Sequence, residues 1–223
     1  MYKIIENRSP YFVKFYIDNI EEIKKFVNEC LQNLNTDNSI EKRNVPSYQH
    51  LNLKINDAQK VIDMFPLSKS FKFEKERVAV FVTPPYGGGG IHKDGPETDL
   101  TKRVSYGPHN ISFNIPIEIW DNACKTKWFD DEMFDKWENL TSHTKYSRNV
   151  FLDFTKTDQF SPAAETIMSD DCVMLINTEK WHTFYNNGPN IRKILTIRLA
   201  KSERQNYDFS SVAKKILYEE EEK

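Results

Sequence analysis

Glycine is scarce in this sequence, which contains only 7 glycines among 223 residues. Four of them form a single run, Gly87–Gly90, and Gly95 and Gly107 follow in the same region. Glycine permits tight turns and a close approach of the backbone to other groups. The remaining glycine, Gly188, comes shortly after His182. This uneven distribution marks the first of these regions as one of special backbone geometry.

An excess of charge of one sign is also lacking. The chain has 31 Lys and Arg residues against 33 Asp and Glu residues, which gives a formal net charge of -2. Strongly charged partners such as nucleic acids select for a clear basic excess. We therefore expect neither nucleic acid nor an anionic membrane as the main partner.

Closely spaced cysteines and long apolar runs are missing as well. Cys30, Cys124 and Cys172 are odd in number, far apart and without C-x-x-C spacing, whereas disulfide and metal frameworks need paired or clustered cysteines. No apolar run approaches the roughly 20 residues of a membrane span, and the N-terminal residues lack the apolar stretch of a signal peptide. We interpret the chain as a cytoplasmic protein with reduced thiols and no membrane part.

The sequence does contain many aromatic residues, at 13% of the chain, which favours a folded core over a disordered chain. Amphipathic spacing of apolar residues predicts helices, whereas alternating or β-branched runs predict strands. The predicted helices cover residues 18–34, 57–65, 131–140 and about 210–218. The predicted strands cover residues 71–83, 110–117, 150–154, 172–177 and 191–199.

We expect one domain over residues 1–223. Residues 1–70 are predicted to form a helical N-terminal support, residues 71–200 the β core, and residues 201–223 a C-terminal helix with an acidic tail. The strands do not alternate with helices, which argues against a parallel doubly wound sheet. Short strands separated by turns instead predict a mainly β fold, an antiparallel sandwich or barrel with flanking helices.

The segment Ile91–Gly95 contains the first candidate metal ligands, His92 and Asp94. Residues i and i+2 of an extended segment face the same side. His92 and Asp94 can therefore present one nitrogen and one oxygen to a single ion. Taken alone this pair is a weak signal, because His-x-Asp occurs by chance in many proteins.

The second part of the pattern is Trp181-His182, with Arg192 ten residues after His182. A dense turn signal covers residues 185–190. The turn predicts that the strand 191–199 folds back beside His182. Arg192 would then lie near the metal.

The residue types at these positions suit one kind of chemistry. Two histidines and one carboxylate on one face leave three positions of an iron ion open. A 2-oxo acid fills two of them and dioxygen takes the third. The far carboxylate of 2-oxoglutarate needs a fixed bidentate cation, for which an arginine is better suited than a lysine. The set His92, Asp94, His182 and Arg192 supplies each of these parts.

The order His-x-Asp, His, and Arg about ten residues later resembles the Fe(II)/2-oxoglutarate-dependent oxygenase superfamily. The preceding Pro84-Pro85-Tyr86 and Gly87–Gly90 resemble its prolyl-hydroxylase-like and phytanoyl-hydroxylase-like branches. The segments NIPI at 114–117 and CKTKWF at 124–129 resemble small phage and marine bacterial members. The resemblance covers roughly residues 78–200.

This resemblance implies a double-stranded β-helix, or jelly roll, as in the cupins, with the metal in its mouth. It implies Fe(II) and 2-oxoglutarate as cofactors, dioxygen as a reactant, and hydroxylation of a small molecule or a peptidyl side chain. Asp94 at the carboxylate position argues against halogenation, because halogenases of the superfamily usually carry a small residue there. The substrate itself is not encoded in any motif.

Further residues are predicted around the cosubstrate. Arg198 and Thr196 share a strand face with Arg192, and Arg198 is an alternative partner of the distal carboxylate. Asn114 and Tyr86 are further candidate contacts to the cosubstrate. The candidate substrate contacts are Tyr106, Trp128 and Trp181. Surface exposure or core packing is the alternative for each of these side chains, and residues 95–109 are predicted to form a polar loop over the site.

Three other interpretations stay open. A cupin-type metal-binding protein or isomerase shares the fold, and His182-x-x-x-Asn186 fits the second cupin motif, although the His-x-His of the first motif is missing. A zinc hydrolase would use the same three ligands, with Glu97 as a weak general base, but would leave Arg192 without a role. A non-catalytic jelly roll that acts as a binding module would not need an intact triad.

Overall fold

The computed structural model describes residues 2–34, 43–45, 48–89, 91–92, 94, 98–99, 104–105, 111–120, 123–130, 132, 161–204 and 206–221. Several predictions fall outside these residues. They are the strand 150–154, Tyr106, and most of the helix 131–140 and of the loop 95–109.

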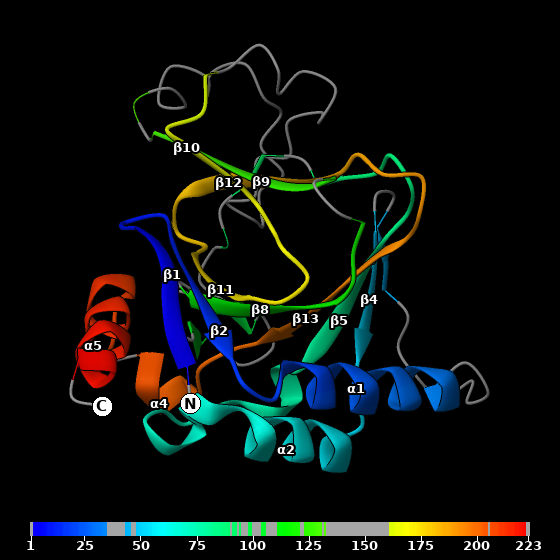
Figure 1. Cartoon of the computed structure of the whole chain (residues 1–223), viewed down its shortest axis with the longest axis horizontal. Coiled ribbons are helices and arrows are strands. Elements are labelled where there is room, and N and C mark those ends of the chain that lie inside the picture. The colour runs from blue at the N-terminus through cyan, green and yellow to red at the C-terminus, as the bar shows by residue number, and fades with distance from the viewer. Residues whose placement is uncertain are drawn as a thin grey trace.

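A large antiparallel sheet forms the centre of the molecule (Figure 1). Its strands follow the spatial order β1-β2-β11-β8-β13-β5-β4-β3, so that neighbours in space are mostly distant in sequence. The strand bounds are β1 Tyr2–Arg8, β2 Phe12–Ile17, β3 Arg43–Val45, β4 Tyr48–Asn52, β5 Ala79–Thr83, β8 Ile111–Glu118, β11 Val173–Asn177 and β13 Arg192–Ile197.

A smaller sheet lies over one face of the large sheet (Figure 1). Its order is β10-β9-β12, with bounds Ala164–Ile167, Cys124–Phe129 and Trp181–Asn186 respectively. Two isolated bridges, from Gly88 to Tyr185 and from His92 to His182, extend it along the free edge of β12. The two-residue strands β6 Thr98–Asp99 and β7 Val104–Ser105 pair with one another.

Helices cover the opposite face of the large sheet, with α1 and α2 side by side beneath it in Figure 1. Their apolar residues share one core with those of the sheet. The bounds are α1 Ile20–Leu34, α2 Ile55–Met64, α4 Lys201–Arg204, α5 Phe209–Glu221, and the short 3-10 turns η1 Pro66–Lys69 and η2 Lys75–Arg77. Among the described residues, no helix combines the length and the apolar character that crossing a bilayer requires.

Strand β8 shows how the alternation of side chains separates two cores. Ile111, Phe113 and Ile115 belong to the core under the helices, whereas Ser112 and Asn114 lie on the face toward the small sheet. A second, smaller apolar cluster fills the space between the two sheets. Its members are Phe12, Cys124, Trp128, Met168, Met174, Ile176 and Ile194. Two facing antiparallel sheets confirm the predicted mainly β sandwich.

The predicted elements match the structure in part. The helices at 18–34, 57–65 and 210–218 and the strands at 110–117, 172–177 and 191–199 are present with bounds shifted by a few residues. The strand predicted over 71–83 is wrong in its first half, because η2 interrupts it and only β5 forms a continuous strand there. Residues 1–70 are not helical throughout, since they also form β1 to β4. Strands β9, β10 and β12 were not predicted.

Phe113 is the aromatic centre of the core under the helices, and its replacement should be costly. The ring is fully buried and contacts the rings of Phe15, Phe65 and Phe73. Phe113→Ala should lower the free energy of unfolding by about 3–5 kcal/mol, measured by urea denaturation. The exposed Tyr218→Ala is the matched control and should change it by about 0.5 kcal/mol or less. Equal denaturation midpoints for both variants would contradict this account.

Candidate metal centre

His92 and His182 are brought together by their own backbones. The N–H of each residue donates to the carbonyl of the other, at 2.9 Å in both directions. Residues paired in this way present their side chains on the same face of the ladder. Two residues later, the N–H of Asp94 donates to the carbonyl of Thr178 at 2.9 Å, which places Asp94 beside the start of β12.

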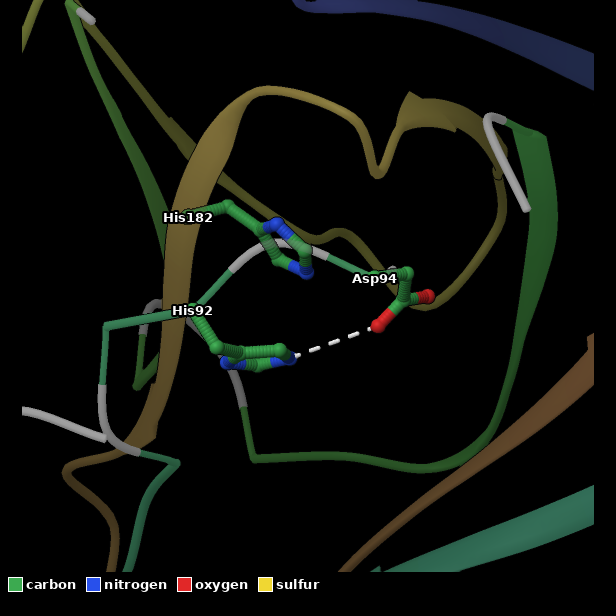
Figure 2. A group of neighbouring side chains, drawn as sticks. All are labelled: His92, Asp94 and His182. Carbon is green, nitrogen blue, oxygen red and sulfur yellow. Dashed lines mark ion pairs between the residues drawn. The ribbon is translucent and has the colours of Figure 1, made fainter. Parts of the chain in front are cut away.

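The three side chains converge on one point (Figure 2). Their candidate ligand atoms all lie within 4.8 Å of one another. His92 Nε2 is 3.7 Å from Asp94 Oδ1, and the two imidazole rings have centroids 4.4 Å apart. Two ring nitrogens and one carboxylate oxygen at this spacing are suited to a divalent transition metal. Among the described residues this is the cluster of His, Cys, Asp and Glu that could hold an ion.

His182 is held in the form that binds a metal. Its Nδ1 lies 2.8 Å from the carbonyl oxygen of Lys180, so Nδ1 carries the proton and Nε2 keeps its lone pair. Burial, and then the charge of His92, lower the pKa of His182 to about 4, against the opposing effect of Asp94. The ring is therefore neutral at pH 7.

Asp94 is held in its charged form by an arginine. Arg198 donates from Nη2 to Asp94 Oδ2 at 2.9 Å. Burial alone would raise the pKa of Asp94, but the charges of Arg198, His92 and His182 and the hydrogen bond from Arg198 outweigh it and lower the pKa to about 2. Because Oδ2 is engaged, Oδ1 is the oxygen that faces His92. The carboxylate is thus arranged to bind a metal through a single oxygen.

Arg192 is a buried charge between the two sheets. Its side chain is only 4% exposed, its guanidinium carbon lies 5.1 Å from the centroid of the Phe184 ring, and it contacts the thiol of Cys124. Burial lowers the pKa of Arg192 to about 10, so the group still carries its charge at pH 7. In the part of the chain that the structure describes, Arg192 forms no ion pair with a carboxylate, and its Nε has no hydrogen-bond partner.

Other predicted residues lie on the same inner face. Thr196 is buried and donates from Oγ1 to Asn114 Oδ1 at 3.1 Å, and Ser112 Oγ donates to the same oxygen at 3.0 Å. Arg198 forms an ion pair with Asp94, whereas Arg192 does not. The structure therefore brings Asn114 and Thr196 together on the inner face of the large sheet, between Arg192 in β13 and Arg198 directly after β13.

Of the aromatic residues predicted to contact the substrate, Trp128 lies directly opposite His182 in the ladder between β9 and β12. Trp128 is fully buried, stacks on Phe12 with centroids 5.0 Å apart, and donates from Nε1 to the carbonyl of Asn177; its surroundings are those of a core residue. Trp181 is buried and precedes His182 on β12, so its side chain points to the other face of the strand. Tyr86 is 69% exposed, in a turn with φ of 55°. Tyr106 lies outside the described residues.

The expected return of the chain beside His182 is wrong. Strand β13 pairs with β5 and β8 in the large sheet, and not with β12 in the small sheet. The turn after β12 carries the chain from one sheet to the other. Arg192 still reaches the site, because its side chain extends between the sheets to Phe184.

Two glycines allow the metal segment to approach β12. A Cβ on Gly88 would lie 2.6 Å from the carbonyl oxygen of Phe184, and one on Gly89 would lie 2.7 Å from the Phe184 ring. Neither contact is tolerated by real Cβ atoms. Gly88 and Gly89 are thus needed for the strand pairing that positions His92. The run stands out in the sequence, whereas Phe184 and Cys124 belong to no motif and were not predicted.

Comparison with known proteins gives a match at the level of the fold. No family model and no curated protein matches the sequence. HygX from Streptomyces hygroscopicus, solved with nickel and 2-oxoglutarate bound, is 10% identical, with 83% of this chain and 81% of that chain covered and a TM-score of 0.50. A prolyl hydroxylase from Trichoplax adhaerens, in complex with a hypoxia inducible factor peptide fragment, is 8% identical, with coverages of 89% and 87% and a TM-score of 0.51. These likenesses confirm the predicted double-stranded β-helix.

The pairing of Arg198 with Asp94 can be tested through the pKa of Asp94. In Arg198→Met the largest favourable charge is removed while burial remains, so the pKa of Asp94 should rise from about 2 to above its ordinary value of 3.8. In the unaltered protein the depressed pKa stabilises the fold above about pH 4, and this stabilisation is lost as the pH falls toward 2. A carboxyl-carbon NMR titration of metal-free protein measures both variants. The exposed Arg8→Met is the control, and an unchanged Asp94 titration in Arg198→Met would refute the assignment.

Proposed function

We propose that this chain is an Fe(II)- and 2-oxoglutarate-dependent oxygenase, with His92, Asp94 and His182 as the metal ligands. Two imidazoles and one monodentate carboxylate leave several positions of an octahedral ion open. Such open positions are what a metal that activates dioxygen requires, and the cosubstrate supplies the electrons for the oxidation. The expected outcome is hydroxylation of a small molecule or a peptidyl side chain.

The observation that carries this proposal is the unpaired charge of Arg192. An ionised group taken out of water without a partner costs several kcal/mol. Arg192 is buried, remains charged at pH 7, and has no acidic partner among the described residues. A site of this kind is completed by an anion. The distal carboxylate of 2-oxoglutarate is an anion that an arginine binds well, through two parallel hydrogen bonds.

The spacing between the metal ligands and Arg192 supports the same ligand. His182 and Phe184 share one face of β12, two residues apart, which corresponds to about 7 Å along an extended strand. Arg192 lies over the Phe184 ring. A ligand that binds the metal with one end and Arg192 with the other therefore has the length of a short dicarboxylic acid. A zinc hydrolase would have no need for a buried cation at this depth.

Arg198 and Asn114 have separate roles in this proposal. Arg198 orients Asp94 and does not bind the distal carboxylate, because its guanidinium is engaged at 2.9 Å by the metal-binding carboxylate. Asn114 and Thr196 line the space between the metal and Arg192, where their polar groups contact the cosubstrate. Trp128 lies directly opposite His182 in the small sheet and packs on Phe12 between the two sheets.

The range of substrates follows from structures with the same fold. HygX was solved with 2-oxoglutarate and nickel, a common stand-in for Fe(II), and the Trichoplax adhaerens prolyl hydroxylase was solved with a peptide fragment. A jelly roll of this size thus holds a peptide fragment in one protein and 2-oxoglutarate in another, and the proposal keeps both a peptidyl side chain and a small molecule as substrates.

An anaerobic titration tests the proposal directly. Fe(II) and 2-oxoglutarate should together give the weak visible charge-transfer band of a metal-bound 2-oxo acid. His92→Ala should abolish the band, because one of three protein ligands is lost. Arg192→Met should weaken 2-oxoglutarate binding by about 10- to 100-fold, as expected when charge-assisted hydrogen bonds are removed. The exposed Arg8→Met is the control and should titrate like the unaltered protein.

The opposite outcome is equally informative. If Fe(II) binds to the triad but no band forms at saturating 2-oxoglutarate, the oxygenase proposal is wrong. A cupin-type metal-binding protein or isomerase, which uses the same fold without 2-oxoglutarate, then becomes the better account.

A further inference from the structure

Two buried polar atoms on the paired strands β5 and β13 have no hydrogen-bond partner among the described residues. They are Arg192 Nε and Thr83 Oγ1, in side chains that are 4% and 0% exposed. A buried donor without an acceptor costs about 1–3 kcal/mol. Two such atoms within one small region indicate that a ligand completes the site.

The sheet register places these two residues side by side. Arg192 of β13 is directly opposite Thr83 of β5, and residues paired in this way have Cβ atoms about 5 Å apart on the same face. Val80 and Leu195 are each three residues from Thr83 and Arg192, so their side chains lie on the opposite face of the sheet. Both belong to the core under the helices, so Thr83 and Arg192 lie on the inner face, toward the small sheet. The hydroxyl and the guanidinium therefore open into the same space.

The surroundings of Arg192 leave the edge of its guanidinium available. The Phe184 ring lies over the guanidinium, whereas the N–H donors of arginine lie in the plane of the group. An acceptor in that plane can receive hydrogen bonds from the guanidinium edge. Thr83, on the adjacent strand, is positioned to donate to the same acceptor.

A buried amide fixes the position of Thr83. Asn186 at the end of β12 donates from Nδ2 to the carbonyls of Pro84 at 3.0 Å and Asn190 at 2.7 Å, with Thr83 O at 3.4 Å. The Asn186 side chain therefore connects the end of β5 to the turn before Arg192 through hydrogen bonds to their backbone carbonyls. The two donors keep a fixed separation, as preorganised binding of a small anion requires.

We infer that Thr83 is a cosubstrate-binding residue, whose hydroxyl donates to the same distal carboxylate as Arg192 and so makes the site selective for dicarboxylic 2-oxo acids. This inference rests on the proposed function, since it assigns a third donor at the cosubstrate site of that reaction. It also gives a role to a fully buried hydroxyl that has no hydrogen-bond partner among the described residues. Thr83 belongs to no motif in the sequence.

The test compares two acids that differ only at the distal end. 2-Oxoglutarate carries the second carboxylate, whereas 2-oxopentanoate has the same five-carbon chain without it. Thr83→Val should weaken the binding of 2-oxoglutarate to the anaerobic Fe(II) protein by about 10-fold, as for the loss of a hydrogen bond to a charged group. The affinity for 2-oxopentanoate should change less than about 2-fold, and Thr83→Ser should retain the affinity for 2-oxoglutarate.

Stability provides a second readout. Because the Thr83 hydroxyl has no hydrogen-bond partner in the part of the chain that the structure describes, Thr83→Val should leave the thermal midpoint unchanged or raise it. The control Thr166→Val removes a buried hydroxyl that already donates to a carbonyl, that of Ile167. It should lower the midpoint and leave the binding of both acids unchanged.

Each remaining outcome overturns a stated claim. If Thr83→Val binds 2-oxoglutarate as tightly as the unaltered protein, or loses affinity for both acids equally, Thr83 does not contact the distal carboxylate. If the unaltered protein binds neither acid in the presence of Fe(II), the proposed function fails, and the assignment of Thr83 fails with it.

Discussion

The paired hydrogen bonds between the backbones of His92 and His182 are the contact on which the candidate site depends. They add a segment from the first half of the β core to the free edge of the small sheet. An uncovered strand edge would otherwise present its N–H and C=O groups to other chains. The same pairing turns both imidazoles to one face and sets Asp94 beside them. The same backbone contact thus extends the small sheet and brings the candidate metal ligands together.

Local sequence signals predicted those parts of the fold that depend on local chemistry. The amphipathic spacing that gave α1 and the β-branched run that gave β11 are each complete within a few residues. Strand β9 was missed although its sequence, CKTKWF, alternates lysines with Cys124, Thr126 and Trp128, because the run is short and lysine is depleted in strands. Strands β1 and β2 were missed because their charged residues lie on a partly exposed hairpin at the edge of the large sheet.

The site shows the same division between local and distant information. The residues His92, Asp94, His182 and Arg192 could be selected from their types and spacing. Their arrangement could not, because the chain passes from the small sheet to the large sheet after β12 instead of forming a hairpin. The pairing of Arg198 with Asp94 joins residues from distant parts of the chain, and no periodicity within one strand reveals it.

The hydrogen bond from Arg198 to Asp94 has a consequence for the overall charge of the centre. One positive guanidinium cancels one negative carboxylate, and His182 is neutral at pH 7. The protein therefore offers a divalent ion almost no net compensating charge, unlike sites that hold metals with several carboxylates. A cation in this centre would keep most of its charge, and a dianionic ligand that reaches both the cation and Arg192 would offset two of the three positive charges. By thermodynamic reciprocity, the cation would strengthen the binding of the dianionic ligand, and the ligand would strengthen the binding of the cation. The protein would then retain its metal poorly when the organic acid is scarce, and the supply of that acid would set the fraction of molecules that are loaded.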